Sequence, residues 1–296
     1  MLTVGVDLAA EPANTAVARI RWTDSFAQVQ AVGVGIDDPA LVEEITASDK
    51  AGIDCPLGWP WRFVQFVAQP QAGAFVAPAE VAGKDWRRQL ALRETDLVIR
   101  STTGLIPLSV AADRIGLAAM RCAGPLARLA AAGAPVDRSG AGVVVEVYPA
   151  AALKQWGLTY RRYKGFTNTT IRHQLVDTLT AAAPWLTLGD HAQACRRSDH
   201  ALDAVIAALN ARAAALHLTT TPGAEQLGAA RTEGWIALPT GNLANLIQNL
   251  VQVGQPRRDA SPIDARTPDP SGRAPGFNQS SLRTCRGASH RDGAAG

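Results

Sequence analysis

The order of hydrophobic segments at the start of the chain restricts the fold more than any other feature. Three β-like runs cover residues 2–8, 15–22 and 28–34, with short polar or glycine-containing segments between them, which predicts an antiparallel meander. Asp37 or Asp38 can cap a following helix, and Pro39 suits its first turn. A short strand is expected next at residues 50–54. The sequence therefore predicts a β-β-β-α-β beginning.

The rest of the body alternates between helical and strand-like segments. Residues 56–108 are interrupted by Pro and Gly and then turn arginine-rich, so we interpret them as an insertion or cap. The continuous valines of residues 142–149 suit a strand that is buried on both faces. Helices are predicted at 109–132, 168–182 and 198–216, and a last short strand at 234–238. Together these elements predict one α/β domain over residues 1–245.

The net charge of +3 is unevenly distributed along the chain. Residues 252–296 hold seven Arg against four Asp, which leaves a neutral body. From about residue 253 the chain is rich in Pro, Gly, Ser and Arg, and we expect residues 253–296 to form a disordered tail. A neutral body has no overall electrostatic attraction for nucleic acid, so any site for a polyanion must be a local patch.

The sequence also restricts the compartment and the cofactor chemistry. Its N-terminus lacks the features of a signal peptide and no window reaches ~18 apolar residues, so a cytoplasmic protein without a membrane partner is expected. The cysteines are far apart and form no C-x-x-C pair, so the sequence indicates neither a disulfide framework nor a zinc ribbon, and reduced thiols are expected. They are Cys55, Cys122, Cys195 and Cys285. The oligomeric state does not follow from the sequence.

Five carboxylates stand at the ends of predicted strands or at the start of a predicted helix. Asp7 and Asp54 end the first and fourth strands, Glu146 lies among valines, and Asp199 and Asp203 begin the last long helix. A buried acid is costly unless a partner or a metal neutralises it. Asp199 and Asp203 repel each other one helical turn apart, and a cation removes that penalty. Oxygen ligands without a Cys or His cluster favour Mg²⁺ or Mn²⁺.

Each acid taken singly has a structural alternative. Asp7 can simply end a strand, Asp54 can form a turn, and Asp199 can start a helix behind its Ser198 cap. Glu146 can pair with one of the many arginines. Only the joint pattern points to a metal site.

Seven short motifs occur in an order similar to that of the domain-of-unknown-function 429 family. They are Gly5-Val-Asp7-Leu-Ala, Ile53-Asp54-Cys-Pro-Leu-Gly58, Arg93-Glu-Thr-Asp96-Leu-Val-Ile-Arg100, Glu146-Val-Tyr-Pro149-Ala, Tyr163-Lys-Gly165, Asp199-His-Ala-Leu-Asp203-Ala and Glu233-Gly-Trp-Ile-Ala-Leu-Pro239. The resemblance covers about residues 2–240. That family is described as predicted nucleases of RNase H-like fold. The resemblance therefore implies a mixed sheet of three antiparallel strands and further helix-connected strands, with flanking helices and a cap insertion.

The same resemblance implies roles for the acids. In RNase H-like enzymes, acids of the first strand, a later strand and the last helix gather at one end of the sheet. Carried over, Asp7, Glu146 and Asp203 are catalytic metal ligands, Asp199 is a fourth ligand and Asp54 a further catalytic acid. The implied reaction is hydrolysis of a phosphodiester bond in DNA or RNA, with two Mg²⁺ or Mn²⁺ ions that activate water and stabilise the leaving oxygen.

A basic loop near residue 160 offers groups for substrate binding. Lys164 and Arg162 can contact phosphate, and Tyr163 or Tyr160 can stack on a base. The alternative is a solvated basic loop.

Two arginines flank an acid in the Arg-x-x-Asp-x-x-x-Arg segment. Arg93 and Arg100 can bind an anionic substrate or pair internally with Asp96. His200, next to the acids of the last helix, can act as a proton shuttle or be an ordinary surface histidine.

Two other functions compete with the nuclease. A noncatalytic nucleic-acid or nucleotide binding module can keep the fold without turnover, although acids at the site oppose polyanion binding. An actin-like phosphotransferase shares a first-strand Asp, but Leu-Ala-Ala-Glu follows Asp7 here in place of a glycine-rich phosphate turn. Metal binding distinguishes the nuclease from the module, and nucleotide binding would favour the phosphotransferase.

Overall fold

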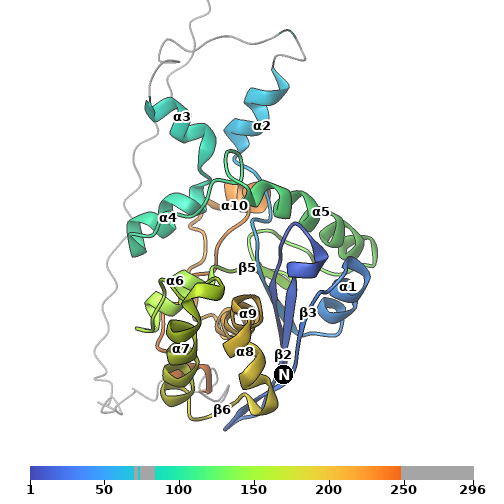
Figure 1. The fold of residues 1–296 in the computed structure, drawn as a ribbon. Coiled ribbons are helices and arrows are strands. Elements are labelled where there is room, and N and C mark those ends of the chain that lie inside the picture. Colours follow the sequence, from blue (N-terminus) through green and yellow to red (C-terminus); the bar gives the residue numbers. More distant parts are fainter. Residues whose placement is uncertain (70–72, 74–83, 248–296) are drawn as a thin grey trace, which may run out of the picture. The chain divides into compact units, whose positions relative to one another are not determined.

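A six-stranded mixed sheet organises the computed structural model, which describes residues 1–69, 73 and 84–247 (Figure 1). Its strands are β1 (Leu2–Asp7), β2 (Ala16–Trp22), β3 (Ala27–Val34), β4 (Lys50–Asp54), β5 (Val144–Glu146) and β6 (Leu186–Thr187), in the order β5-β4-β1-β2-β3-β6. β1, β2 and β3 pair antiparallel, whereas β4, β5 and β6 pair parallel with β1, β4 and β3. The predicted meander and the fourth strand are confirmed.

Ten α-helices connect and flank these strands within the described residues. They are α1 (Asp38–Thr46), α2 (Trp61–Ala68), α3 (Lys84–Ala91), α4 (Glu94–Thr103), α5 (Ile115–Ala131), α6 (Pro149–Gln155), α7 (Thr169–Ala182), α8 (Ala192–Arg197), α9 (Asp199–Ala215) and α10 (Leu227–Glu233). The predicted start of α1 is confirmed, because the Asp37 carboxylate accepts a hydrogen bond from the Ala40 N–H over 3.0 Å.

Helix α9 lies directly on the sheet, where it packs against β1, β2 and β4 (Figure 1). Every residue from Ala201 to Ala213 is buried, and six of these thirteen are alanines. A Cβ atom placed on Gly5 of β1 would lie only 2.0 Å from the Ala204 carbonyl oxygen. The absence of a side chain at Gly5 thus lets the helix and strand backbones touch, which holds the start of α9 beside the end of β1.

The sheet is covered on both faces. Val4 and Val6 of β1 belong to a cluster with Leu41 of α1 and Leu129 of α5 on one face. Gly5, which alternates with these valines, faces α9 on the other side. A strand buried on both sides is rich in Val and small residues, as the sequence of β1 is.

The valine-rich segment and the last predicted strand are shorter than expected. β5 spans Val144–Glu146 rather than 142–149, because Pro149 starts α6. Residues 234–238 form no strand and contribute one isolated bridge, between Ile236 and Glu146. The sequence did not predict β6, which has only two residues and therefore too little periodicity to detect.

The long helix predicted at 109–132 begins later than expected. α5 starts at Ile115, and the Ser109 hydroxyl instead donates to the Ala91 carbonyl over 2.6 Å. Residues 56–108, the predicted insertion or cap, contain α2, α3 and α4, and α4 packs against α6 and α10. The predicted tail, residues 253–296, lies outside the described residues. In the part of the chain that is described, no helix combines the length and apolar character needed to cross a bilayer.

Candidate acidic site and its neighbouring ion-pair network

Three carboxylates meet where β1 and β4 end. Asp7 and Asp54 are register partners at the last positions of these parallel strands, so their side chains point to the same side of the sheet. Asp203 reaches the same place from the first turns of α9. One carboxylate oxygen of each residue lies within 4.8 Å of the others. We call Asp7, Asp54 and Asp203 the acidic cluster.

Polar side chains hold two members of the acidic cluster in position. Tyr163 donates its hydroxyl hydrogen to Oδ1 of Asp203 over 2.8 Å, and Lys164 Nζ lies 2.6 Å from Oδ2. His200 Nδ1 lies 2.5 Å from Oδ2 of Asp7. The acidic cluster is therefore preorganised, with one cation on Asp203 and one titratable ring on Asp7.

Burial and the repulsion of neighbouring carboxylates work against ionisation of Asp54 and Asp203. Burial, opposed by Lys164 and reinforced by Asp7 and Asp203, raises the pKa of Asp54 well above its ordinary value. Burial likewise raises the pKa of Asp203. Burial alone would lower the pKa of Lys164, but Asp203 and Asp54 raise it above its ordinary value. Additional positive charge at this position would thus stabilise the ionised acidic cluster.

The hydrogen bond with Asp7 is also the main cause of the shift in the pKa of His200. It raises the pKa of the imidazole, although partial burial opposes the change. With Nδ1 bonded to the carboxylate, Nε2 is the ring nitrogen that can exchange a proton. This placement suits the proton-shuttle role considered from the sequence.

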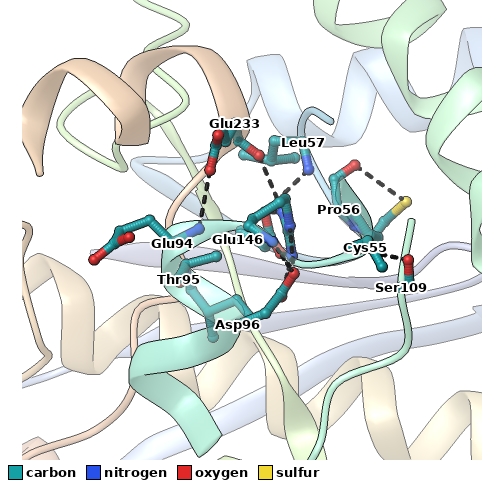
Figure 2. Close-up of polar contacts among 12 residues, drawn as sticks. Cys55, Pro56, Leu57, Glu94, Thr95, Asp96, Ser109, Glu146 and Glu233 are labelled. Atoms are coloured by element: carbon teal, nitrogen blue, oxygen red, sulfur yellow. Dashed lines mark hydrogen bonds and ion pairs between the residues drawn. The ribbon is translucent and has the colours of Figure 1, made fainter. Parts of the chain in front are cut away.

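Glu146, predicted as a metal ligand, lies instead in a buried ion pair. Its Oε2 and Oε1 atoms accept hydrogen bonds from Arg93 Nη1 and Nη2 over 2.8 and 2.7 Å. Oε2 also accepts the Leu57 N–H over 3.0 Å (Figure 2). Both carboxylate oxygens are therefore engaged, and Glu146 does not belong to the acidic cluster. The structure thus shows the alternative considered from the sequence, in which Glu146 pairs with an arginine.

Arg93 uses all of its donors inside the protein. Besides Glu146, its guanidinium donates to both oxygens of Asp96 and to the Glu233 carbonyl. The residue is 1% exposed, and a guanidinium offers five N–H groups. No donor remains for an anionic substrate, so of the two sequence-based interpretations only internal pairing with Asp96 fits.

Glu233 is an important residue that the sequence did not reveal. Its buried carboxylate accepts the N–H of Trp61 over 2.7 Å. It also accepts the N–H of Glu94 over 2.9 Å (Figure 2). These are the first residues of α2 and α4, where a negative charge is favourable. The only sequence signal was its place in a family motif, which does not identify the helices that it would cap.

The remaining predicted residues are not members of the acidic cluster. Asp199 accepts the Gly165 N–H over 2.8 Å. Burial favours its neutral form, but this hydrogen bond and that of its own backbone lower the pKa of Asp199 overall. Arg100 is exposed on α4. The Tyr163 ring is only 1% exposed and packs in the core, so it cannot stack on a base as predicted.

A cavity of about 410 Å³ borders the acidic cluster. Asp54 and Lys164 line it at the cluster side, and Arg162, Tyr148, Tyr160 and Leu108 contribute elsewhere to its wall. Its size is within the range of small-molecule sites, roughly 300–1,000 Å³.

Comparison with known proteins places the chain in a family. No curated protein and no solved structure matches it. A family model described as a protein of unknown function, DUF429, matches residues 5–226, which include the whole acidic cluster and confirm the resemblance seen in the short motifs. The chain therefore belongs to the DUF429 family.

Proposed function

We propose that this protein is a metal-dependent phosphodiester hydrolase of RNase H-like fold that acts on nucleic acid with Mg²⁺ or Mn²⁺. The convergence of Asp7, Asp54 and Asp203 within 4.8 Å carries the proposal. The strand order β5-β4-β1-β2-β3 supports it, because it has three antiparallel strands followed by parallel ones, as the family resemblance implies.

The acidic cluster fits a small divalent cation. In octahedral coordination, ligands on opposite sides of Mg²⁺ lie about 4.2 Å apart, twice the metal–oxygen distance. The three carboxylate oxygens lie within 4.8 Å of one another, an upper bound somewhat above this value, and all three donors are the hard oxygens that Mg²⁺ and Mn²⁺ prefer. Asp7, Asp54 and Asp203 would hold the ion. Because Glu146 is engaged by Arg93, the proposal relies on these three acids rather than on the larger ligand set expected from the sequence.

The bound ion would polarise a phosphoryl oxygen and make water a stronger nucleophile. The other groups belong to the chain. Half of the Lys164 side chain is exposed, so its ammonium can turn from Asp203 to a phosphate and stabilise negative charge. His200, held through Nδ1 by Asp7, can take or return a proton at Nε2. Tyr163 keeps Asp203 oriented through its hydroxyl.

Calorimetric titration with Mn²⁺ tests the proposal on wild type and on an Asp7→Asn, Asp203→Asn double variant. A nuclease assay on single-stranded, duplex and hybrid substrates uses the same samples. Asp190→Asn is the matched control, because Asp190 is exposed and is not a member of the acidic cluster. We expect binding and cleavage to be lost together in the double variant only. Absence of Mn²⁺ binding at millimolar metal, with oligonucleotide present, would contradict the proposal.

The contact between Lys164 and Asp203 favours one second candidate, a noncatalytic nucleic-acid binding module. A lysine 2.6 Å from the carboxylate compensates part of the cluster charge without a metal. This candidate predicts oligonucleotide binding that does not change when Mn²⁺ is added, and no cleavage by any variant.

A further inference from the structure

The lining of the cavity beside the acidic cluster combines charged and apolar side chains. Its charged lining residues include Asp54, Lys164 and Arg162, besides the ion-paired Arg93 and Glu146, and Tyr148, Leu108 and Ile115 are among its apolar and aromatic lining residues. Leu108 is 58% exposed, so its side chain offers apolar surface at the wall of the cavity. The cavity therefore offers both charged groups and apolar, partly aromatic groups to one ligand.

Asp54 and Lys164 connect this cavity to the proposed metal site. Asp54 belongs both to the acidic cluster and to the cavity wall. Lys164 lines the cavity while its ammonium lies 2.6 Å from Asp203. A molecule that fills the cavity thus has one end next to the carboxylates.

Arg162 provides a positive charge on the same wall. It is exposed, and it makes no hydrogen bond or ion pair with any other residue that the structure describes. Its φ of 59° lies in the left-handed region, which is costly for a residue other than glycine. An unpaired guanidinium in the wall of the cavity that Asp54 and Lys164 also line is suited to an anionic ligand group, such as a phosphate.

Tyr160 and Tyr148 supply the aromatic surface. Lys154 Nζ and the Arg161 guanidinium each lie 5.2 Å from the centre of the Tyr160 ring, so cation–π contacts hold this ring in place. Tyr148 is half-buried, immediately before α6. Aromatic and apolar walls of this kind bind the face of a nucleobase without reading its sequence.

We infer that this cavity takes an unpaired nucleobase, with the adjoining phosphate between Arg162, Lys164 and the acidic cluster. The inference deepens the proposed hydrolase function and rests on it, because the acidic cluster defines where the phosphate must lie. A base inside a duplex is stacked and paired, so it can enter the cavity only after it leaves the helix. The substrate class is consequently single-stranded nucleic acid, or a strand with an extrahelical nucleotide.

Binding measured without turnover tests this inference. The probes are single-stranded DNA and RNA oligonucleotides with one 2-aminopurine, and the same strands annealed to their complements, in buffer with EDTA. Ala150→Phe fills the cavity from α6, where Ala150 lines the wall. Met120→Phe is its control, since Met120 is 63% exposed on α5 and lies outside the cavity lining. Arg162→Gln is paired with Arg128→Gln, an exposed arginine of α5.

We expect wild type to bind single strands at least about tenfold more tightly than duplexes, a difference of roughly 1.4 kcal/mol. Ala150→Phe and Arg162→Gln should each weaken single-strand binding by about tenfold or more, while both controls bind like wild type. Unchanged circular dichroism and an unchanged Mn²⁺ affinity of Ala150→Phe would show that the variant is folded with an intact acidic cluster.

The outcomes separate this inference from the proposed function. Equal affinity for duplex and single strand, or wild-type binding by Ala150→Phe, would overturn the inference even if Mn²⁺ binds and duplex is cleaved. Cavity-dependent binding of single strands without any Mn²⁺ binding would support the inference and overturn the hydrolase. The DNA and RNA arms show which sugar the site accepts.

Discussion

Arg93 and Glu146 form a two-point ion pair in the interior, with Nη1–Oε2 and Nη2–Oε1 distances of 2.8 and 2.7 Å. Their side chains are 2% and 3% exposed. The pair joins the start of α4 to the end of β5, and through the Leu57 N–H also to the segment after β4. This buried ion pair therefore connects segments that are distant in sequence, and it lies beside the acidic cluster but is separate from it.

Loss of the Arg93–Glu146 ion pair should destabilise the protein strongly. Arg93→Met leaves the carboxylates of Glu146 and Asp96 buried without their shared cation, and breaking a buried pair in this way costs about 3–5 kcal/mol. Arg93→Lys should restore little, because an ammonium cannot replace the five planar donors. Urea unfolding measures both effects, with Arg128→Gln as control. A loss below about 1 kcal/mol for Arg93→Met would match a surface pair instead.

The structure and the sequence pattern make different predictions for two acids. We expect Asp54→Asn to weaken Mn²⁺ binding by about tenfold or more, because it removes one of three charged ligands. Glu146→Gln should leave the Mn²⁺ affinity of the folded protein within about twofold, since both Glu146 oxygens already bind Arg93. Calorimetry at a temperature where both variants are folded measures this. The reverse ranking would mean that Glu146 is the metal ligand.

Gly5 should tolerate no side chain. A Cβ atom there would lie 2.0 Å from the Ala204 carbonyl oxygen and 2.2 Å from the Ala208 nitrogen. Backbone atoms of a packed helix cannot move away from such a contact without a large cost in stability. Gly5→Ala should destabilise the protein by about 3 kcal/mol or more and displace Asp203 from Asp7. Gly124→Ala is the control, because nothing lies within 4 Å of that position in α5. It should be neutral or stabilising by up to about 1 kcal/mol. Similar melting temperatures for the two variants would contradict the close packing of α9 on β1.

Thiol chemistry tests the burial of the cysteines. Cys55, Cys122 and Cys195 are buried, and burial raises the pKa of Cys195 to about 12. Reactivity requires the thiolate, so these thiols should not react with DTNB at pH 8 in the native protein. A Cys285→Ser variant leaves only these three. We expect no rapid reaction before denaturation and three equivalents after it. A thiol that reacts in the native state would show that its surroundings open to solvent.

Lys50 gives the chain a specific dependence of stability on pH. Its ammonium donates to the Gly140 and Gly142 carbonyls, both over 2.6 Å. Burial, only partly opposed by Asp137, lowers the pKa of Lys50. The unfolded chain, with an ordinary lysine pKa of about 10.4, then binds the proton more tightly than the folded chain. Stability should therefore rise with pH until the unfolded lysine also loses its proton.

The comparison of wild type with Lys50→Met isolates this effect. Between about pH 8.5 and 10.5 the free energy of unfolding of wild type should rise relative to that of the variant. Lys84→Met, at an exposed lysine of α3, should follow wild type. Parallel curves for wild type and Lys50→Met would show that the Lys50 pKa is not lowered by folding.

The local structure of much of the chain follows from short stretches of the sequence. The alternating runs of β1 to β3, the Asp37 cap of α1 and the short strand 50–54 each depend on a few consecutive residues. The sequence also identified Asp7, Asp54 and Asp203, because acids at strand ends and helix starts stand out locally. The strand predicted at 234–238 failed because pairing of that segment is decided by distant residues, among them Glu146.

The partners of the charged groups depend on the tertiary structure. Glu146 and Arg93 are 53 positions apart, and Arg93 reaches the Glu233 carbonyl across 140 positions. The sequence presented Glu146, Asp54 and Asp203 as similar acids, and the fold brought a guanidinium to the first and left the other two together with Asp7. Local patterns encode helices, strands and caps, whereas the partner of a buried charge depends on which remote segments the packing brings within a few ångströms.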